Sequence, residues 1–367
     1  MTPFDRKRLV FRPLRDRKSK ASIEEVAADP DAPPPGAGEA GRALDEIAEA
    51  VRAARRRGAA VVLCHGAHLI RNGLGTVVNR LLREGWVTHV ATNGAGSIHD
   101  WEFAFQGRST EDVRENVAVG EFGMWEETGA VAGLALLAGA ADGLGYGASM
   151  GRTISTEEIR IPSREEILRG VDRVLGGSSP PETAACAARL DLLAAVESAG
   201  IASGALPIPH PWKAYSVQAA AFELGIPLTV HPGVGQDIIY AHPLVDGAAL
   251  GRAALADFLL LASSIERLEG GVYLSVGSSV MSPMVFEKSL SMARNVRRQA
   301  GLALGDFLIA VNDLARPAWD WSRGEPPKDD PAYYVRFLKS FSRMGGRLVY
   351  VGADNRVFLR NLYARLR

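Results

Sequence analysis

The sequence predicts an α/β protein built on a doubly wound, mostly parallel, Rossmann-like sheet with helices on both faces. Two observations predict this fold. Short apolar runs alternate along the chain with amphipathic helical segments, which is the rhythm of parallel βαβ units. Most of these runs also end in small or polar residues rather than in another apolar stretch. With 367 residues, 47% of them hydrophobic, the chain is long enough to bury a complete core.

The predicted strands are rich in Val, Ile and Leu, as is typical of strands buried on both faces. They fall at residues 59–64, 87–92, 226–230, 272–276, 307–311 and 348–351. Helical periodicity precedes four of them, and a glycine separates each helix from its strand. These helices are expected over residues 42–57, 77–83, 214–224 and 253–268.

Domain boundaries follow from composition. Residues 1–41 are expected to form an N-terminal arm and linker, because residues 29–35 carry four prolines and cannot form a helix or a central strand. The basic residues of this arm are expected to be solvated. Residues 42–367 are expected to form a single α/β NAD-binding-like domain. The βα rhythm breaks near residues 143–181, where we expect a helical insertion.

Charge and hydropathy exclude several classes of partner. Lys and Arg together number 42, as do Asp and Glu, so no overall positive field draws the chain to nucleic acid or to an anionic membrane. The first residues lack a signal-peptide pattern, and no apolar run is expected to reach the ~18–20 residues of a membrane span. We therefore expect a cytoplasmic protein that binds neither nucleic acid nor membrane.

Glycine and polar residues gather where the predicted strands end. The second strand is followed by Asn93-Gly94-Ala95-Gly96 and then His99-Asp100, the third by His231 and Asp237, the fourth by Gly277-Ser278, and the fifth by Asn312-Asp313. In an open parallel sheet, ligands bind beyond the carboxyl ends of the strands. Glycine allows close approach of the backbone to a ligand, and free N–H groups at helix starts hold anions. The pattern predicts a nucleotide-type site.

Other motifs are weaker. Gly36, Gly38 and Gly41 match GxGxxG but follow a proline-rich linker rather than a strand, so the dinucleotide-binding context is missing. The loop histidines, among them His65 and His68, lack the spacing of a metal site, and we predict no metal. No GxSxG nucleophile elbow is present. Asp100 and Asp237 each follow a glycine-rich turn, where a carboxylate either contacts a ligand or caps a helix.

Taken together, the loops resemble those of the deoxyhypusine synthase family, over most of residues 59–315. Residues 93–100 resemble that family's glycine loop followed by acids, residues 225–239 its stretch leading to a Gly-Asp pair, and residues 276–280 its glycine-rich turn. Val311-Asn312 resembles its Ile-Asn-Thr turn. The order and spacing of these segments agree with the family.

The resemblance implies NAD as cofactor and a small amine as substrate, held in a homo-oligomer, a tetramer by analogy. By position, Asp237 would bind the cationic nitrogen, with Asp100, His99 and His231 as further catalytic candidates. The NAD would be lined by Asn93, Gly94, Ala95, Gly96, Gly277, Ser278, Asn312 and Asp313. The family's catalytic lysine lies in a Trp-Gly-Lys segment that this chain lacks, and Arg323 and Lys328 do not replace it. Aminobutyl transfer to a protein lysine, the family's polyamine chemistry, is therefore not expected.

Three functional hypotheses follow. The first is an NAD-dependent transferase or deaminase-like enzyme acting on a small amine or amino acid. The second is a non-catalytic nucleotide- or metabolite-binding protein on the same sheet. The third is a hydrolase or lyase that uses the loop histidines without nicotinamide. Carried nucleotide separates the first from the third, and turnover separates it from the second.

Overall fold

The computed structural model describes residues 2–177, 179–315 and 318–367. Its central sheet has the strand order β10-β9-β8-β2-β3-β7, and every neighbouring pair is parallel. The strands are β2 (Val61–His65), β3 (His89–Asn93), β7 (Leu228–His231), β8 (Val272–Val276), β9 (Leu308–Asp313) and β10 (Arg347–Gly352). These are the six predicted strands, and the fold class is confirmed.

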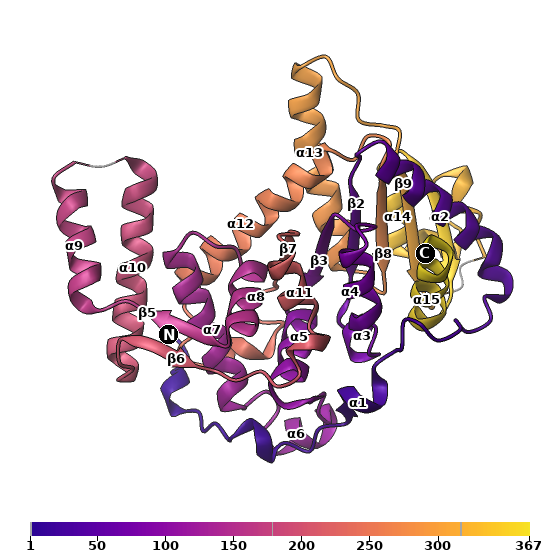
Figure 1. Cartoon of the computed structure of the whole chain (residues 1–367). Coiled ribbons are helices and arrows are strands. Elements are labelled where there is room, and N and C mark those ends of the chain that lie inside the picture. Colours follow the sequence, from indigo (N-terminus) through magenta and orange to yellow (C-terminus); the bar gives the residue numbers. More distant parts are fainter. Residues whose placement is uncertain (1, 178, 316–317) are drawn as a thin grey trace.

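Helices cover both faces of this sheet, as Figure 1 shows. Alternate residues of β2 explain why: Val61 and Leu63 pack into one core, while Val62 and Cys64 pack into the other. The first core is closed by α2 (Gly41–Arg56), α4 (Gly75–Arg83) and α15 (Asn355–Leu366), and the second by α12 (Gly247–Glu266), α13 (Met281–Gln299) and α14 (Arg336–Ser342).

A long excursion separates β3 from β7. Within it, α9 and α10 form a hairpin that projects from the sheet at the left of Figure 1. The expected insertion at 143–181 covers α8, β5, α9 and the start of α10, and its residue 178 lies outside the described residues. The excursion consists of α5 (Gly94–Gln106), β4 (Arg108–Ser109), α6 (Val113–Val119), α7 (Glu126–Ala141), α8 (Tyr146–Thr156), β5 (Glu158–Ile161), α9 (Arg164–Leu175), α10 (Pro180–Ala199), β6 (Gly204–Pro207) and α11 (Val217–Glu223).

The N-terminal arm is part of the packed structure, so the prediction of a solvated basic arm is wrong for two of its arginines. Arg6 donates to the backbone carbonyls of Tyr240, His242 and Val245 at 2.9–3.1 Å. Arg17 is 4% exposed and makes a two-pronged ion pair with Glu102 at 2.6 and 2.7 Å. The strand β1 (Ala21–Ser22) then pairs with β4. The arm is held because buried carboxylate and carbonyl oxygens require these cationic donors.

Helix α12 corrects the expectation that no segment is long and apolar enough to span a membrane. It passes that test by length and composition, with a mean hydropathy of 1.5. Its Asp257 is 1% exposed, and one carboxylate oxygen accepts the N–H groups of Gly147 and Val230 at 2.9 and 2.7 Å. Those contacts tie the middle of α12 to α8 and β7. They give it the environment of a core helix covering a sheet.

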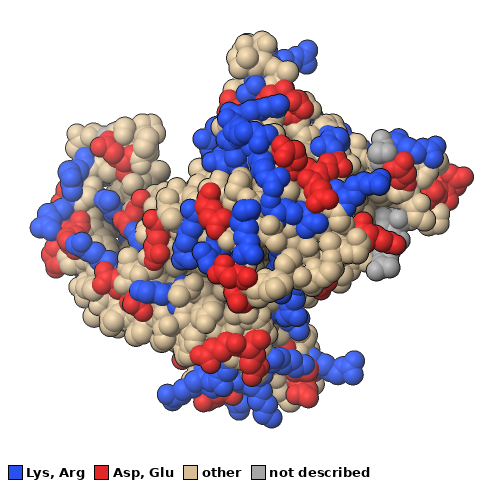
Figure 2. Space-filling model, turned by 45° about the vertical axis from the view of Figure 1, so that its right-hand side comes forward, with Lys and Arg blue, Asp and Glu red and all other residues tan. Residues whose placement is uncertain are grey.

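Charged side chains of both signs are interspersed over the face drawn in Figure 2. This agrees with the equal numbers of basic and acidic residues in the sequence. Local pairs contribute to the pattern, for example Arg12 with Glu121 at 2.9 Å and Arg152 with Asp142 at 2.7 Å.

Candidate active site

The strand order contains a topological switch point. Numbered along the chain within the sheet, the strands lie in the order 3-2-1-4-5-6, with β2 and β8 as the adjacent strands 1 and 4. The connections after β2 and β8 therefore leave in opposite directions. The crevice between them, at the carboxyl edge, is where doubly wound sheets of this order bind dinucleotides.

Two glycines face each other across this crevice. Gly66, which follows β2, donates its N–H to Val276 at 3.1 Å. A Cβ at Gly66 would stand 2.1 Å from the carbonyl oxygen of Gly277, so no other residue fits at position 66 without a backbone shift. Gly277 has φ +59°, a conformation that L side chains rarely adopt. At this point the two loops therefore pack backbone against backbone, with no side chain between them.

Buried polar atoms without partners also lie at the switch point. Asn312 donates from Nδ2 to Oδ1 of Asn355 at 2.9 Å, but its own Oδ1 has no partner among the described residues. The Nδ1 of His65 lies 3.0 Å from the carbonyl of Gly66, while its buried Nε2 has no partner in the described part of the chain. Burial lowers the pKa of His65 to about 4. Buried polar atoms are nearly always satisfied, so both atoms call for a partner such as an ordered water or a bound ligand.

Four other cofactor candidates have local structural roles. The side chain of Asn93 accepts the N–H of Gly96 at 2.9 Å and caps α5. The hydroxyl of Ser278 accepts the N–H of Ser282 at 3.2 Å, and the carboxylate of Asp313 accepts that of Ala315 at 3.0 Å. A Cβ at Gly96 would stand 2.2 Å from the Thr92 hydroxyl. These contacts fix the conformation of the loops. Because the side chains are used in them, a ligand would contact the backbone of these residues.

A cavity of about 480 Å³ lies against α5 near this edge. Its volume is within the range of small-molecule binding sites. Among its walls are the predicted residues Ala95, His99 and Asp237, together with Arg71 from α3 (Ala67–Arg71). Gly277, Ser278, Asn312 and Asp313 do not line it. The predicted residues thus divide into a switch-point group and a cavity group. The short helix α3 joins them, since its N-cap is Gly66 and its last residue is Arg71.

Asp237 lies against the start of α5. A Cβ at Gly94 would stand only 2.3 Å from its Oδ2, which is why a glycine follows β3. The Tyr240 hydroxyl donates to the same oxygen at 3.1 Å. Burial raises the pKa of Asp237, and the hydrogen bonds from Tyr240, Gly233 and Ala95 oppose that rise. No cation pairs with Asp237 among the described residues, so its carboxylate is available to a cationic ligand.

The imidazole of His99 is fixed in one tautomer by a chain of hydrogen bonds. Burial raises the pKa of Glu102, but Arg17, His99 and Ser109 together outweigh burial and the net pKa is lowered, so this residue is a carboxylate that only accepts. The single hydroxyl proton of Ser109 therefore goes to Glu102, at 2.5 Å. The Ser109 oxygen, 2.7 Å from Nδ1 of His99, must then accept the proton on Nδ1. This leaves a lone pair on Nε2, and burial lowers the pKa of His99, which keeps the ring neutral.

Asp100 and His231 lie outside the cavity. Asp100 is buried and accepts from the Ser216 hydroxyl and the N–H groups of Val217 and Gln218 at 2.6–3.1 Å. Asp100 therefore caps the start of α11, although it belongs to α5. His231 contacts the Thr229 hydroxyl at 3.0 Å within the buried face of β7, and burial lowers its pKa to about 4.

Sequence reasoning missed Arg71 and Asn355, and it placed Gly66 in a strand-end loop without assigning it to the cofactor. Asn355 opens α15 directly after β10, so the rule that selected the other strand ends also applies to it. Gly66 stands directly after β2 and two residues beyond the end of the first predicted strand. Arg71 had no such signal, because nothing local shows that the end of α3 faces a cavity.

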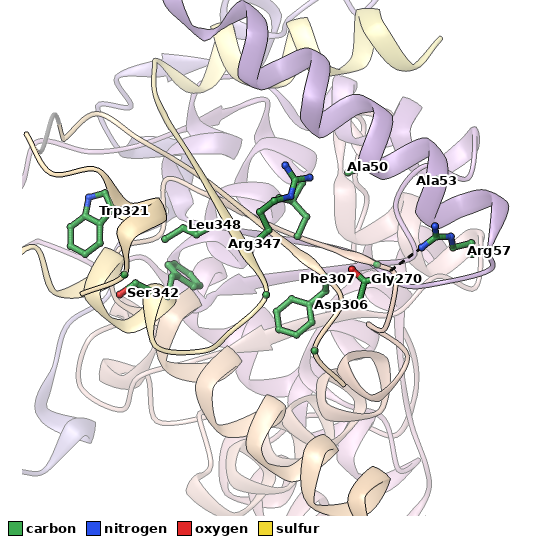
Figure 3. A pocket seen from close by; sticks show the side chains of 16 residues that line it. Ala50, Ala53, Arg57, Gly270, Asp306, Phe307, Trp321, Ser342, Arg347 and Leu348 are labelled. Carbon is green, nitrogen blue, oxygen red and sulfur yellow. Dashed lines mark ion pairs between the residues drawn. The ribbon is translucent and has the colours of Figure 1, made fainter. Parts of the chain in front are cut away.

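A larger cavity, about 690 Å³, lies at the amino edge of β8, β9 and β10. Figure 3 shows Arg57 reaching Asp306 on one side of it and Trp321 on the other. Arg57 pairs with Asp306 at 3.9 Å, and Arg347 pairs with Glu46. Its charged groups are thus paired, and it lies at the edge opposite to the one where such sheets bind ligands. We therefore place the candidate site at the carboxyl edge despite the smaller volume there.

Comparison with known proteins gives little sequence support for a family. No family model and no curated protein matches the chain. Among solved structures, an arginine dihydrolase, ArgZ, from the ornithine–ammonia cycle in cyanobacteria is similar, with 16% identity and a TM-score of 0.42 over 89% of this chain and 32% of its own. AgrE, solved with ornithine and NAD+, gives 16% and 0.43 over 91% and 34%.

A conserved putative LOR/SDH protein from Methanococcus maripaludis S2 is also similar, with 13% identity and a TM-score of 0.39 over 93% of this chain and 72% of its own. The chain spans about one third of the length of ArgZ and AgrE.

Proposed function

We propose that this protein is an NAD-dependent enzyme acting on a small amine or amino acid, as a transferase or a deaminase-like enzyme. The observation that carries the proposal is the junction of two features at one sheet edge. A glycine-floored switch point with unpartnered buried atoms adjoins a cavity that holds a free carboxylate and a neutral histidine. NAD is found with AgrE, one of the similar structures. The resemblance to deoxyhypusine synthase supports the same cofactor.

The residues at the switch point fit a dinucleotide. The N–H groups of Gly66 and Gly277 already donate to Val276 and Asn312, so a pyrophosphate placed beside these glycines would take its donors from the helix starts that follow them. The unpartnered Oδ1 of Asn312 is an acceptor, and so is Nε2 of His65, and an amide or hydroxyl of the cofactor would donate to them. Asn355 fixes the orientation of the Asn312 amide. Bound NAD+ would supply the hydride acceptor for a C–H bond next to the substrate nitrogen.

The chain itself supplies binding and proton transfer. Asp237 would hold the substrate ammonium, since it is one of two cavity carboxylates, with Glu111, that have only neutral partners in the described residues. Oxidation at the neighbouring carbon requires the nitrogen to lose a proton. The lone pair on Nε2 of His99 would accept that proton, and the Ser109–Glu102 chain would stabilise the imidazolium that forms. Asp100 would support this arrangement by fixing α11.

The protein is expected to act as a cytoplasmic homo-oligomer on small molecules, without nucleic acid or membrane partners. A non-catalytic binding protein would share the switch point. Binding alone does not require a histidine such as His99, whose proton is held on Nδ1 and whose Nε2 can accept a proton at the cavity wall. For this reason we prefer the enzyme. A hydrolase or lyase would use the same histidine without nicotinamide.

The first test is isothermal titration of NAD+ into the purified protein, with denaturing extraction to detect carried nucleotide. We expect either carried NAD or binding in the micromolar range, which corresponds to about −8 kcal/mol. A Gly277→Val variant is expected to lose this binding while keeping its circular dichroism spectrum. A protein that neither carries nor binds NAD would refute the redox proposal and favour the hydrolase or lyase.

Replacing Asp237 by asparagine is expected to weaken binding of a cationic substrate by about 10- to 100-fold, because a charge-assisted contact of about 1.5–3 kcal/mol is lost. NAD binding is expected to stay nearly intact, because Asp237 lies in the cavity group. Calorimetric titrations of both ligands into Asp237→Asn check this. Equal losses for both ligands would instead assign Asp237 a structural role.

A further inference from the structure

Several charged groups around the 480 Å³ cavity, of both signs, have no countercharge among the described residues. Lys20 pairs with Asp112, and Arg17 pairs with Glu102. Glu111 accepts from Gly123 N–H and the indole of Trp125 at 3.1 and 3.0 Å.

Arg71 and Arg114 also line the cavity. Neither makes a side-chain hydrogen bond or ion pair with the residues that the structure describes. Asp237 has only neutral donors around it. Two carboxylates, Asp237 and Glu111, and two guanidinium groups are thus left without a countercharge among the described residues, and Glu111 already accepts three hydrogen bonds, from Asn116, Gly123 and Trp125.

Arg71 and Asp237 line the same cavity but do not form an ion pair with each other. The space between them therefore suits a ligand that carries both complementary charges. Guanidinium groups match carboxylates in a two-pronged geometry, and a carboxylate matches an ammonium. The adjacent walls, Ile98, Phe122 and Ile238, are apolar and offer contact to a side chain.

The position of Arg71 also distinguishes it from Arg114. Arg71 ends α3, whose N-cap Gly66 is at the switch point, whereas Arg114 belongs to α6. At about 1.5 Å per residue, the five residues of α3 span only about 7.5 Å. A group held by Arg71 therefore lies on the side of the cavity that faces the cofactor crevice.

We propose that the substrate is an α-amino acid, with its ammonium held by Asp237 and its carboxylate held by Arg71. This inference rests on the proposed function and names its substrate class. Arg71 orients the α-carbon between the crevice and His99. Oxidation then breaks the Cα–H bond, whose electron pair passes to NAD+ as hydride. One N–H proton passes to His99, and an imino acid and NADH are formed.

The test compares amino acids with the amines that lack only the carboxylate. L-leucine is paired with isopentylamine, and L-ornithine with 1,4-diaminobutane. Each compound is titrated into the protein saturated with NAD+, and thermal shifts are recorded in parallel. At least one amino acid is expected to bind about 10- to 100-fold more tightly than its amine, the worth of one charge-assisted carboxylate contact.

The variant Arg71→Gln is expected to abolish this preference and to leave amine binding and NAD+ binding unchanged. Arg83→Gln is the matched control, because Arg83 is likewise an exposed arginine at the end of a short helix, α4. Arg114→Gln is expected to retain the preference.

Four results would overturn the proposal while leaving the NAD-dependent enzyme in place. Amines bind as tightly as amino acids, or NAD+ binds and neither class does. Arg114→Gln rather than Arg71→Gln removes the preference. Arg71→Gln weakens the binding of NAD+, which would mean that the Arg71 guanidinium contacts a phosphate of the cofactor. Failure of NAD+ to bind the wild-type protein is a separate result, and it refutes the proposed function instead.

Discussion

Replacing His99 by glutamine is expected to lower turnover of the amino-acid substrate by about 10²- to 10⁴-fold, the usual worth of a positioned general base. Glutamine keeps a polar side chain in the cavity wall but cannot accept the proton. NAD+ and amino-acid affinities are expected to change little, because neither charge of the substrate is assigned to His99. Formation of NADH measured under saturating ligand checks the prediction.

The dependence on pH gives an independent readout. A base must be unprotonated, and burial lowers the pKa of His99. The rate is therefore expected to rise with pH through an apparent pKa below the ordinary histidine value of about 6.5 and then to level off. Ser109→Ala, which removes the acceptor for Nδ1–H, is expected to reduce turnover less than His99→Gln does. His68→Gln, an exposed histidine outside the cavity wall, is the control. A His99→Gln variant with wild-type turnover would contradict the assignment.

Replacing Arg17 by leucine is expected to lower the free energy of unfolding by about 3–5 kcal/mol, because it leaves the Glu102 carboxylate buried without its countercharge. Arg17 and Glu102 side chains are only 2% and 1% exposed. Glu102 also accepts hydrogen bonds from the hydroxyls of Ser109 and Thr128, but these neutral donors cannot replace the positive charge of Arg17. Urea unfolding followed by circular dichroism measures the change.

Two variants control this prediction. Arg15→Leu removes an arginine of the same arm whose side chain is 82% exposed, and it is expected to cost less than about 1 kcal/mol. The double variant Arg17→Leu/Glu102→Leu removes both charges and is expected to be more stable than Arg17→Leu alone. If the single and double variants unfold at the same urea concentration, the ion pair is not what holds the arm.

Local sequence patterns were enough to predict the sheet. The apolar run at 272–276 coincides with β8, and the other five runs lie within two residues of their strands at either end. Strand prediction succeeded because a strand buried on both faces needs a continuous apolar run, a requirement satisfied within the strand itself. The run of polar and small residues after each strand likewise predicted which edge carries the candidate site.

Contacts distant in sequence could not be predicted in the same way. Asp100 lies next to His99 in α5, yet it caps α11, whose first residue is 117 positions further on. The sequence predicted that the basic residues of the arm are solvated, because it does not show that the buried carboxylate of Glu102 lies beside Arg17. In both cases the partner is supplied by another element, and no local pattern records it.

The sequence by itself determined the fold class, the six strands and the edge of the sheet at which the glycine-rich and polar loops gather. Only the tertiary structure divided the candidate residues into a crevice at Gly66 and Gly277 and a cavity at His99 and Asp237, and only it placed Arg71 in that cavity. The physical reason is the range of the interactions involved. Hydrophobic periodicity is a property of the local sequence of each element. Charge pairing and cavity shape, in contrast, depend on elements that folding brings together.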